Sequence, residues 1–258
     1  MQTAISQVYP DRVLLRGYSL ADLAGSRSFG DVVYLLMTGE LPAGREGQLI
    51  EALLVVCAEH SINAPSTHTA RAVANCGVPV QSAIAAGISA VGEHHGGAGE
   101  ACAHILQDAV RADPTAAPDT VAARLVQEFR AAGKRIPGFG HRFHDPDPRA
   151  ERLLALGDAW QLSGPHVALG RAIVAALQVG ARSLPMNVDG ALAALLSDLG
   201  IDWRFGKAIF IIGRTAGLAA HVHEEMTTGK PFKFIQPVPV EYIGPDERPL
   251  PTGVPACG

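Results

Sequence analysis

Apolar residues recur along most of the chain at the three- and four-residue spacing of amphipathic helices. This spacing predicts helices over 45–60, 67–77, 79–92, 99–113, 118–133, 148–164, 165–181, 189–200 and 203–229. Between 19 and 42, Ser19 is a predicted N-cap, and a second helix is predicted to end at Gly39, before Pro42. No segment alternates well enough for a multi-strand sheet, and no repeat of roughly 20 to 50 residues occurs. The pattern therefore predicts an all-α fold, with an extended, proline-rich tail after 229.

Composition narrows the class of protein. The chain has 258 residues, of which 48% are hydrophobic, enough for one large domain or two small ones. Its net charge of -4 does not suggest a nucleic-acid binder, and its apolar runs are too short or too interrupted to span a bilayer. The N-terminus lacks the basic and then apolar pattern of a signal peptide. We expect a cytoplasmic protein with neither nucleic-acid nor membrane partners.

The four cysteines, Cys57, Cys76, Cys102 and Cys257, lie far apart in the sequence. None forms a CxxC pair, so the spacing favours neither a zinc knuckle nor a disulfide framework. Three of them have apolar neighbours, which is typical of buried free thiols in a reducing compartment.

Histidines gather in pairs where predicted helices meet Gly- or Pro-rich breaks. The pairs are His60 with His68, His94 with His95, and His141 with His144. At such breaks the backbone can approach a ligand, and a histidine can act as acid, base or donor near neutral pH. A structural role is the favoured interpretation for any single histidine, but three similar sites favour a shared pocket.

Two other uses of these segments are disfavoured by spacing. His94-His95, His141 with His144, and His221-x-His223 are the only candidate metal ligands, and no HExxH motif accompanies them. "GKRIPGFG" matches neither GxGxxG nor GxxxxGK[ST], so it does not predict a nucleotide site. We expect no metal.

Charged residues in apolar surroundings complete the set of candidates. Asp189 enters a predicted helix, where an N-cap is the simplest interpretation. Arg214 lies within "AIFIIGRTAGLAAH" and needs either a salt-bridge partner or a ligand carboxylate. Arg142 and Arg149 flank "FHDPDP" with the same two alternatives. Histidines, one candidate base and several arginines suit a small polycarboxylate and proton transfer at carbon, but they do not name the substrate.

Several segments together resemble the citrate synthase superfamily. They are "LLRGYSLADLAGSRSFGDVVYLLMTGELP", "AEHSINAPSTHTARAVA", "GEHHGGAGEA", "IPGFGHRFHDPDPRA", "NVDG" and "FIIGRTAGLAAHVHEE". They occur in the family's order and cover most of the chain. Each segment is weak evidence alone, and together they are specific.

The resemblance implies roles for three catalytic residues. His95 matches the histidine that hydrogen-bonds the thioester oxygen as the enolate forms. Asp189 matches the carboxylate that moves the proton at the acetyl methyl carbon. His141 matches the histidine that exchanges a proton with the oxaloacetate carbonyl or the citryl hydroxyl.

The resemblance also implies which residues bind the substrates. The groups that would hold the carboxylates of a dicarboxylic acid are His60, Arg149 and Arg214, with His68 aligned to a second histidine of the lyase branch. The stretch that would embrace coenzyme A contains Ile136, Pro137 and Gly138. Coenzyme A is thus expected as part of a substrate, with no permanently bound cofactor.

Departures from the synthase pattern point to the lyase branch. The chain is short, "NVDGALAALL" replaces an aromatic-bearing run, and the tail "FKFIQPVPVEYIG" lacks the family's late arginine. These features are more similar to citryl-CoA lyases and the lyase module of ATP-citrate lyase. They imply reversible cleavage of citryl-CoA, or a related 3-hydroxy-3-carboxyacyl-CoA, to acetyl-CoA and oxaloacetate. A citrate or methylcitrate synthase and a non-catalytic CoA-ester-binding relative remain as alternatives.

The resemblance also implies the architecture. It predicts a large helical domain over 1–98 and 185–258 and a small helical domain over 99–184. It further implies a homodimer or higher homo-oligomer that takes a CoA thioester and a dicarboxylic oxoacid.

Overall fold

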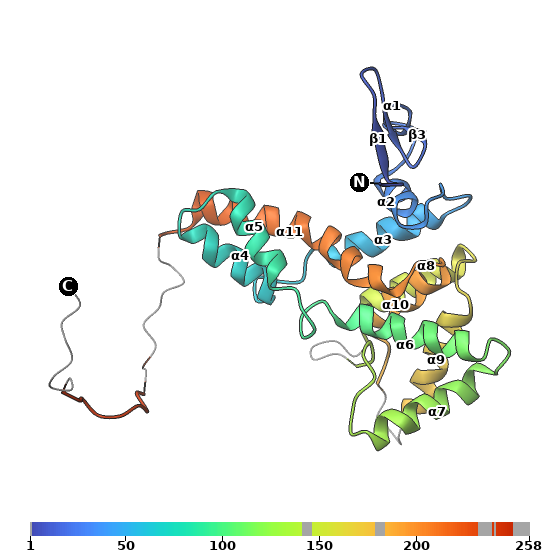
Figure 1. Cartoon of the computed structure of the whole chain (residues 1–258). Helices are drawn as coiled ribbons and strands as arrows, with labels where there is room; N and C mark the ends of the chain where they lie inside the picture. Colours follow the sequence, from blue (N-terminus) through green and yellow to red (C-terminus); the bar gives the residue numbers. More distant parts are fainter. Residues whose placement is uncertain (1, 141–145, 179–183, 232–238, 240, 250–258) are drawn as a thin grey trace.

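Helices form most of the computed structural model, which describes residues 2–140, 146–178, 184–231, 239 and 241–249 (Figure 1). The strands are β1 (Ser6–Val8), β2 (Val13–Leu15) and β3 (Tyr18–Ser19). The helices are α1 (Leu20–Leu23), α2 (Phe29–Thr38), α3 (Glu46–Ala58), α4 (Pro65–Asn75), α5 (Val80–Ser89), α6 (Ala98–Ala112), α7 (Pro118–Ala131), α8 (Pro148–Ala159), α9 (Pro165–Leu177), α10 (Val188–Asp198), the short 3-10 turn η1 (Trp203–Phe205) and α11 (Gly206–Thr228). The all-α prediction is confirmed.

Local chemistry explains where several helices begin and end. Ser19 caps α1 by accepting a hydrogen bond from the Asp22 N–H at 3.3 Å, as its position predicts. Ser28 and Asp31 form a reciprocal capping box at the start of α2. Gly39 ends α2 with a φ of 93°, a left-handed conformation that glycine adopts without strain.

The N-terminal strands are a feature that the sequence pattern does not predict. They form one antiparallel sheet in the order β1-β2-β3, which precedes α1. Each strand has two or three residues, and β1 is exposed along its whole length. Strands this short contain too few residues for alternation to emerge, so the hydrophobic pattern alone misses them.

The main core surrounds α10, which packs against α6, α8 and α9. Every residue from Gly190 to Ser197 is buried. A helix that is apolar on all sides is expected at the centre of a fold, and the small residues of α10 let its neighbours approach closely.

A second, smaller core holds a helical arm together. In Figure 1, α4, α5 and the C-terminal half of α11 project from the main body. Their contact is made by Ala70, Ala74, Ala83, Leu218 and Val222. The 23 residues of α11 extend about 34 Å and join the arm to the body.

The cysteines, the apolar runs and the C-terminal tail are the other features interpreted from the sequence. Cys57 and Cys102 are buried free thiols, as expected for three of the four cysteines, whereas Cys76 is exposed at the end of α4. Within the described ranges, no helix combines the length and apolar character needed to cross a bilayer. Most of the predicted extended tail, and Cys257, lie outside the described residues.

Candidate functional site

The start of α10 carries Asp189, and Asn187 shapes this turn. The Asn187 side chain accepts hydrogen bonds from the N–H groups of Asp189 at 2.9 Å and Gly190 at 3.1 Å. Asn187 is therefore the N-cap, and the interpretation of Asp189 as an N-cap is wrong. Because Asn187 supplies the capping oxygen, the Asp189 carboxyl is not used as the N-cap and can take part in proton transfer.

Burial raises the pKa of Asp189, and two arginines oppose this effect. Arg149 acts more strongly than Arg214, while the negative charge of Asp147 adds to the rise. The balance leaves the pKa of Asp189 above its usual value of 3.8. A carboxyl group with a raised pKa can exchange protons closer to neutral pH, as a general acid or base requires.

Asp147 ties the start of α8 to the start of α10. Its side chain is 1% exposed and accepts from the Arg149 N–H at 3.1 Å and the Val188 N–H at 3.0 Å. The Arg149 guanidinium also donates twice to this carboxylate, at 3.0 Å and 2.9 Å. Asp147 thus fixes Arg149 in orientation, and 21% of the arginine side chain is exposed.

The loop that precedes His141 is attached to the same turn. The Gly140 N–H donates to the Pro185 carbonyl at 2.7 Å, and the Asn187 side chain donates to the Gly140 carbonyl at 2.7 Å. Gly138 has a φ of 87°, and a Cβ there would lie 2.8 Å from the Gly190 Cα. Only glycine fits this close approach. His141 itself, with Arg142 and His144, lies outside the described residues.

The other two residues of the predicted coenzyme A stretch differ in exposure. Ile136 is 5% exposed and belongs to the main core, so its side chain anchors the loop. Pro137 is half-buried and precedes the tight Gly138 turn.

His95 lies in a tight turn before α6. Its backbone exchanges two hydrogen bonds with Gly92, at 2.9 Å and 3.2 Å. The Ser66 N–H donates to the Nε2 atom of His95 at 3.3 Å, and the Ser66 hydroxyl lies 2.8 Å from the same nitrogen. Because a backbone N–H only donates, Nε2 is the acceptor and the neutral ring carries its proton on Nδ1.

The electrostatic surroundings keep His95 neutral. Burial, and then the positive charge of Arg214, lower the pKa of His95 from 6.5. The ring also packs edge-on against Phe210, with the ring centroids 5.6 Å apart. His95 therefore offers a neutral Nδ1–H donor, which suits hydrogen bonding to an oxygen that becomes negative.

Arg214 is buried without a carboxylate partner in the described part of the chain. It is 3% exposed, donates through Nε to the Cys57 carbonyl at 2.9 Å, and reaches the Ser66 hydroxyl at 3.4 Å. No described carboxylate lies within 4 Å of its guanidinium, so the salt-bridge interpretation is not supported. A buried arginine in this state suits an anionic ligand.

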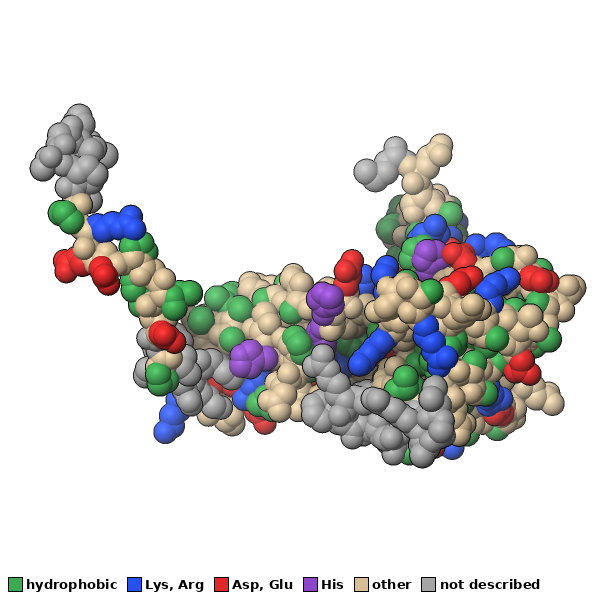
Figure 2. Space-filling view, turned by 90° about the horizontal axis from the view of Figure 1, so that it is seen from below, with side chains coloured by type: hydrophobic (Ala, Val, Ile, Leu, Met, Phe, Trp, Pro, Cys, Tyr) green, Lys and Arg blue, Asp and Glu red, His purple; other side chains and the backbone are tan. Residues whose placement is uncertain are grey.

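His60 and His68 lie on either side of Ser66 in the sequence. His60 is half-buried in the turn between α3 and α4. His68 is exposed in the first part of α4, whereas Ser66 is fully buried. Figure 2 shows histidine side chains on the face where the arm joins the body.

Several functional residues are missed by the sequence interpretation. Ser66 contacts both His95 and Arg214, Asp147 orients Arg149, and Asn187 caps the helix of Asp189. An Asp-Pro pair at a helix start and an Asn two residues before an Asp are capping signals that would have found two of them. Ser66 has no such signal, because its partners come from distant segments.

The described residues contain no group of three or more His, Cys, Asp or Glu side chains arranged to hold a metal ion. The arrangement instead offers a neutral donor, a carboxyl with a raised pKa and two arginines. These groups come from the turn before α6, from the starts of α8 and α10 and from the middle of α11, and Ser66 at the start of α4 contacts two of them.

Comparison with solved structures gives a neighbour that matches along nearly the whole of both chains. The citryl-CoA lyase from Hydrogenobacter thermophilus is 39% identical, with a TM-score of 0.88, and the match covers 97% of each chain. The ATP citrate lyase from Methanosaeta concilii is 22% identical, with a TM-score of 0.76, and shares the fold over 96% of this chain and 42% of its own.

Curated relatives bear synthase names. "Citrate synthase 2" from Bacillus subtilis is 31% identical over 82% of this chain, and "Putative citrate synthase 2" from Mycobacterium tuberculosis is 33% identical over 80%. The chain spans about half the length of these relatives, 55% and 54% respectively. Residues 44–237 match the family "Citrate synthase, C-terminal domain". The chain therefore belongs to the citrate synthase family.

Proposed function

We propose that the protein is a carbon–carbon lyase that cleaves citryl-CoA, or a related 3-hydroxy-3-carboxyacyl-CoA, to acetyl-CoA and oxaloacetate. The observation that carries the proposal is the neutral His95, whose Nε2 accepts from the Ser66 N–H and whose Nδ1–H remains to donate. The identity of 39% with a citryl-CoA lyase over 97% of both chains supports the lyase direction.

The cleavage begins at the citryl hydroxyl, where we assign the base to His141. Removal of the hydroxyl proton forms the oxaloacetate carbonyl as the carbon–carbon bond breaks. The bonding electron pair passes to the thioester as an enolate, whose oxygen accepts from the His95 Nδ1–H. A positioned donor of this kind is worth about a hundredfold to a thousandfold in rate.

Asp189 completes the reaction by protonating the enolate carbon to give acetyl-CoA. Its raised pKa supports this role, because the protonated carboxyl persists closer to neutral pH. Condensation uses the same groups in reverse, with Asp189 as the base.

Two arginines and a histidine are proposed to hold the dicarboxylate product. Arg214 is buried, and Arg149 is oriented by Asp147, so both guanidinium groups are pre-organised for bidentate contacts. His60 is the third group, with His68 as a further candidate.

We also propose a two-domain arrangement and a homo-oligomeric assembly. We propose that 99–184 is a small domain that moves relative to 1–98 and 185–258, and that Ile136, Pro137 and Gly138 contact coenzyme A. A homodimer or higher homo-oligomer is the proposed state.

To test the proposal, citryl-CoA is added to the purified protein. Oxaloacetate is then measured with a malate dehydrogenase couple, and free thiol is measured with a thiol reagent. A lyase releases oxaloacetate without free thiol, and Asp189→Ala abolishes turnover while the thermal melting profile is kept. Retained activity in Asp189→Ala would remove this residue from the mechanism.

A condensing synthase is the second candidate, favoured by relatives named citrate synthase and 2-methylcitrate synthase at about 30% identity. It predicts free thiol from an acyl-CoA and an oxoacid. Binding of CoA esters with no turnover of either kind would instead support a non-catalytic relative.

A further inference from the structure

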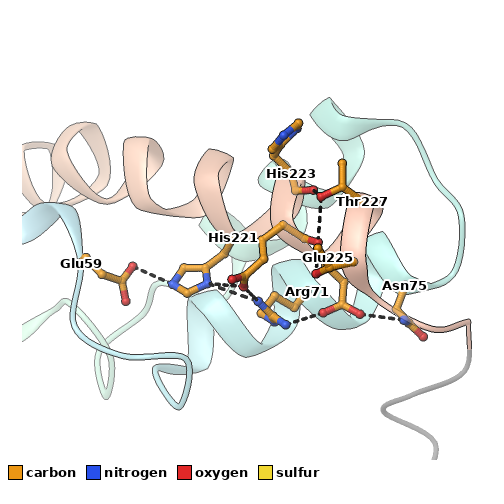
Figure 3. A network of polar contacts seen from close by, with 9 residues as sticks. Glu59, Arg71, Asn75, His221, His223, Glu225 and Thr227 are labelled. Carbon is orange, nitrogen blue, oxygen red and sulfur yellow. Dashed lines mark hydrogen bonds and ion pairs between the residues drawn. The ribbon is translucent and has the colours of Figure 1, made fainter.

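A polar network runs along the contact between α4 and α11, outside the groups assigned above (Figure 3). Arg71 of α4 is 3% exposed and pairs with Glu225 of α11 at 2.6 Å and with Glu224. The Nη1 atom of Arg71 lies 3.4 Å from the Nδ1 atom of His221. On its other side, the Nε2 atom of His221 lies 3.1 Å from a carboxylate oxygen of Glu59, in the segment after α3.

The partners of His221 fix its tautomer. The guanidinium of Arg71 can only donate, so Nδ1 of His221 must accept in that contact. The ring proton of the neutral histidine is then on Nε2, and it is donated to Glu59. Glu224 faces the same Nδ1 from 3.9 Å, beyond hydrogen-bonding distance. His221 thus links a buried arginine to the Glu59 carboxylate in one defined orientation.

A second contact with α11 holds the same segment. A Cβ at Gly217 would lie 2.1 Å from the Ala58 carbonyl oxygen and 2.7 Å from the Glu59 carboxylate. Gly213, one turn earlier, gives the same close approach to the Leu54 carbonyl, at 2.5 Å. The end of α3 therefore lies directly on the backbone of α11, and His221 holds Glu59 one turn beyond Gly217.

The segment held in this way carries His60. Ser61, which follows it, has a φ of 82°, an uncommon left-handed conformation for a non-glycine residue. The Ser61 side chain accepts from the Asn63 N–H at 3.2 Å, and its carbonyl accepts from the Ala64 N–H at 3.1 Å. Such a turn persists where its surroundings hold it, and the Glu59–His221 contact is adjacent to it.

Glu59 also acts on Arg214, the arginine that we propose binds a substrate carboxylate. Among the charged groups near Arg214, Glu59 has the largest effect on the pKa of this arginine, and it raises the pKa against burial. Glu59 therefore contacts His221, acts on the charge of Arg214 and lies beside His60 in the chain.

We propose that His221 is a positioning residue of the dicarboxylate site, which acts through Glu59 on the turn that carries His60. This rests on the proposed function, because it assigns the turn to oxoacid binding. His221 touches no substrate in this role. It sets where His60 lies, so its loss weakens dicarboxylate binding more than it slows the chemical step.

The test compares His221→Leu with two matched variants. His221→Gln keeps one acceptor and one donor, so it should retain most of the affinity. His223→Leu changes an exposed histidine on the same helix, which Figure 3 shows pointing away from the network. Oxaloacetate affinity is measured by calorimetry, and KM and kcat are measured in the condensation direction with acetyl-CoA.

For His221→Leu we expect the Kd and KM for oxaloacetate to rise about tenfold, while kcat and the KM for acetyl-CoA change less than about threefold. In a double-mutant cycle with His60→Ala, the two effects should be non-additive, because they act through one contact. Wild-type affinity in His221→Leu, or full additivity with His60→Ala, would overturn the proposal. Absence of oxaloacetate binding in the wild-type protein would overturn the proposed function instead.

Discussion

Replacing Asp147 with asparagine removes the charge of a side chain that is 1% exposed and that joins the starts of α8 and α10. Removing one partner from a buried ion pair costs about 3–5 kcal/mol. The Arg149 side chain is 21% exposed, so water compensates part of the loss, and about 3 kcal/mol is expected. For a chain of this size, that lowers the melting temperature by about 6–12 °C.

The matched control is Asp158→Asn. Asp158 pairs with Arg171 at 2.6 Å, but the two side chains are 47% and 50% exposed. Exposed pairs contribute about 0.2–1 kcal/mol, so the melting temperature should fall by at most about 4 °C. Both variants are measured side by side by thermal denaturation, followed by fluorescence. Equal shifts in the two variants would refute the assignment of Asp147 as a buried structural charge.

Wild type and Asp147→Asn also provide a test of pH dependence. Burial acts to raise the pKa of Asp147, but hydrogen bonds from the Arg149 side chain and the Val188 N–H outweigh it and hold the pKa below 3.8. A carboxyl whose pKa is lower in the folded state contributes stability above its unfolded pKa, and this is lost as the pH falls through the folded value. The gap in melting temperature between wild type and Asp147→Asn should therefore shrink as the pH falls below about 4.

Three further outcomes follow from the site. Ser66→Ala removes a hydroxyl 2.8 Å from the His95 Nε2 and should lower kcat about threefold to tenfold. Ser89→Ala is the control, because the Ser89 hydroxyl donates to the Ala85 carbonyl of its own helix, and an equal kcat in both variants would contradict the role of Ser66. Gly138→Ala should lower both melting temperature and activity, because its Cβ would lie 2.8 Å from the Gly190 Cα in α10. Gly133→Ala, with a φ of 63° and open space around it, should cost about 1–2 kcal/mol of strain and keep full activity. Nitrogen NMR of the histidine rings should show His95 protonated on Nδ1 with a midpoint below 6.5, and an Nε2–H tautomer would contradict the assignment.

Much of the helical fold is predictable because the apolar spacing is long and regular. The predicted segments over 99–113 and 118–133 correspond to α6 and α7, which each bury one apolar face. The small sheet is not predictable in this way, because its strands have only two or three residues. An apolar neighbourhood in the sequence does not by itself place a cysteine inward, since Cys76 is exposed at a helix end whereas Cys57 and Cys102 are buried.

The candidate site is predictable in part. Histidines beside Gly and Pro breaks, and Arg214 in an apolar helix, are visible in the sequence because such residues are costly to bury alone. Ser66 is not visible, because its contacts with His95 and Arg214 span 29 and 148 residues of chain. The Asp-Pro pair marks Asp147 as a helix cap in the sequence, but its contact with the Val188 N–H, 41 residues away, appears only in the fold.

Three residues of the candidate site share a position that bears on their chemistry. Ser66, Arg149 and Asp189 are each the second residue of a helix, in α4, α8 and α10, after Pro65, Pro148 and Val188. Helix starts carry free N–H groups and a partial positive charge, which favour an anionic substrate. The same field should lower the pKa of Asp189, yet burial wins and its pKa is raised. A site that attracts carboxylates through helix starts, but desolvates its own carboxyl, can bind a polyanion and still return a proton to carbon.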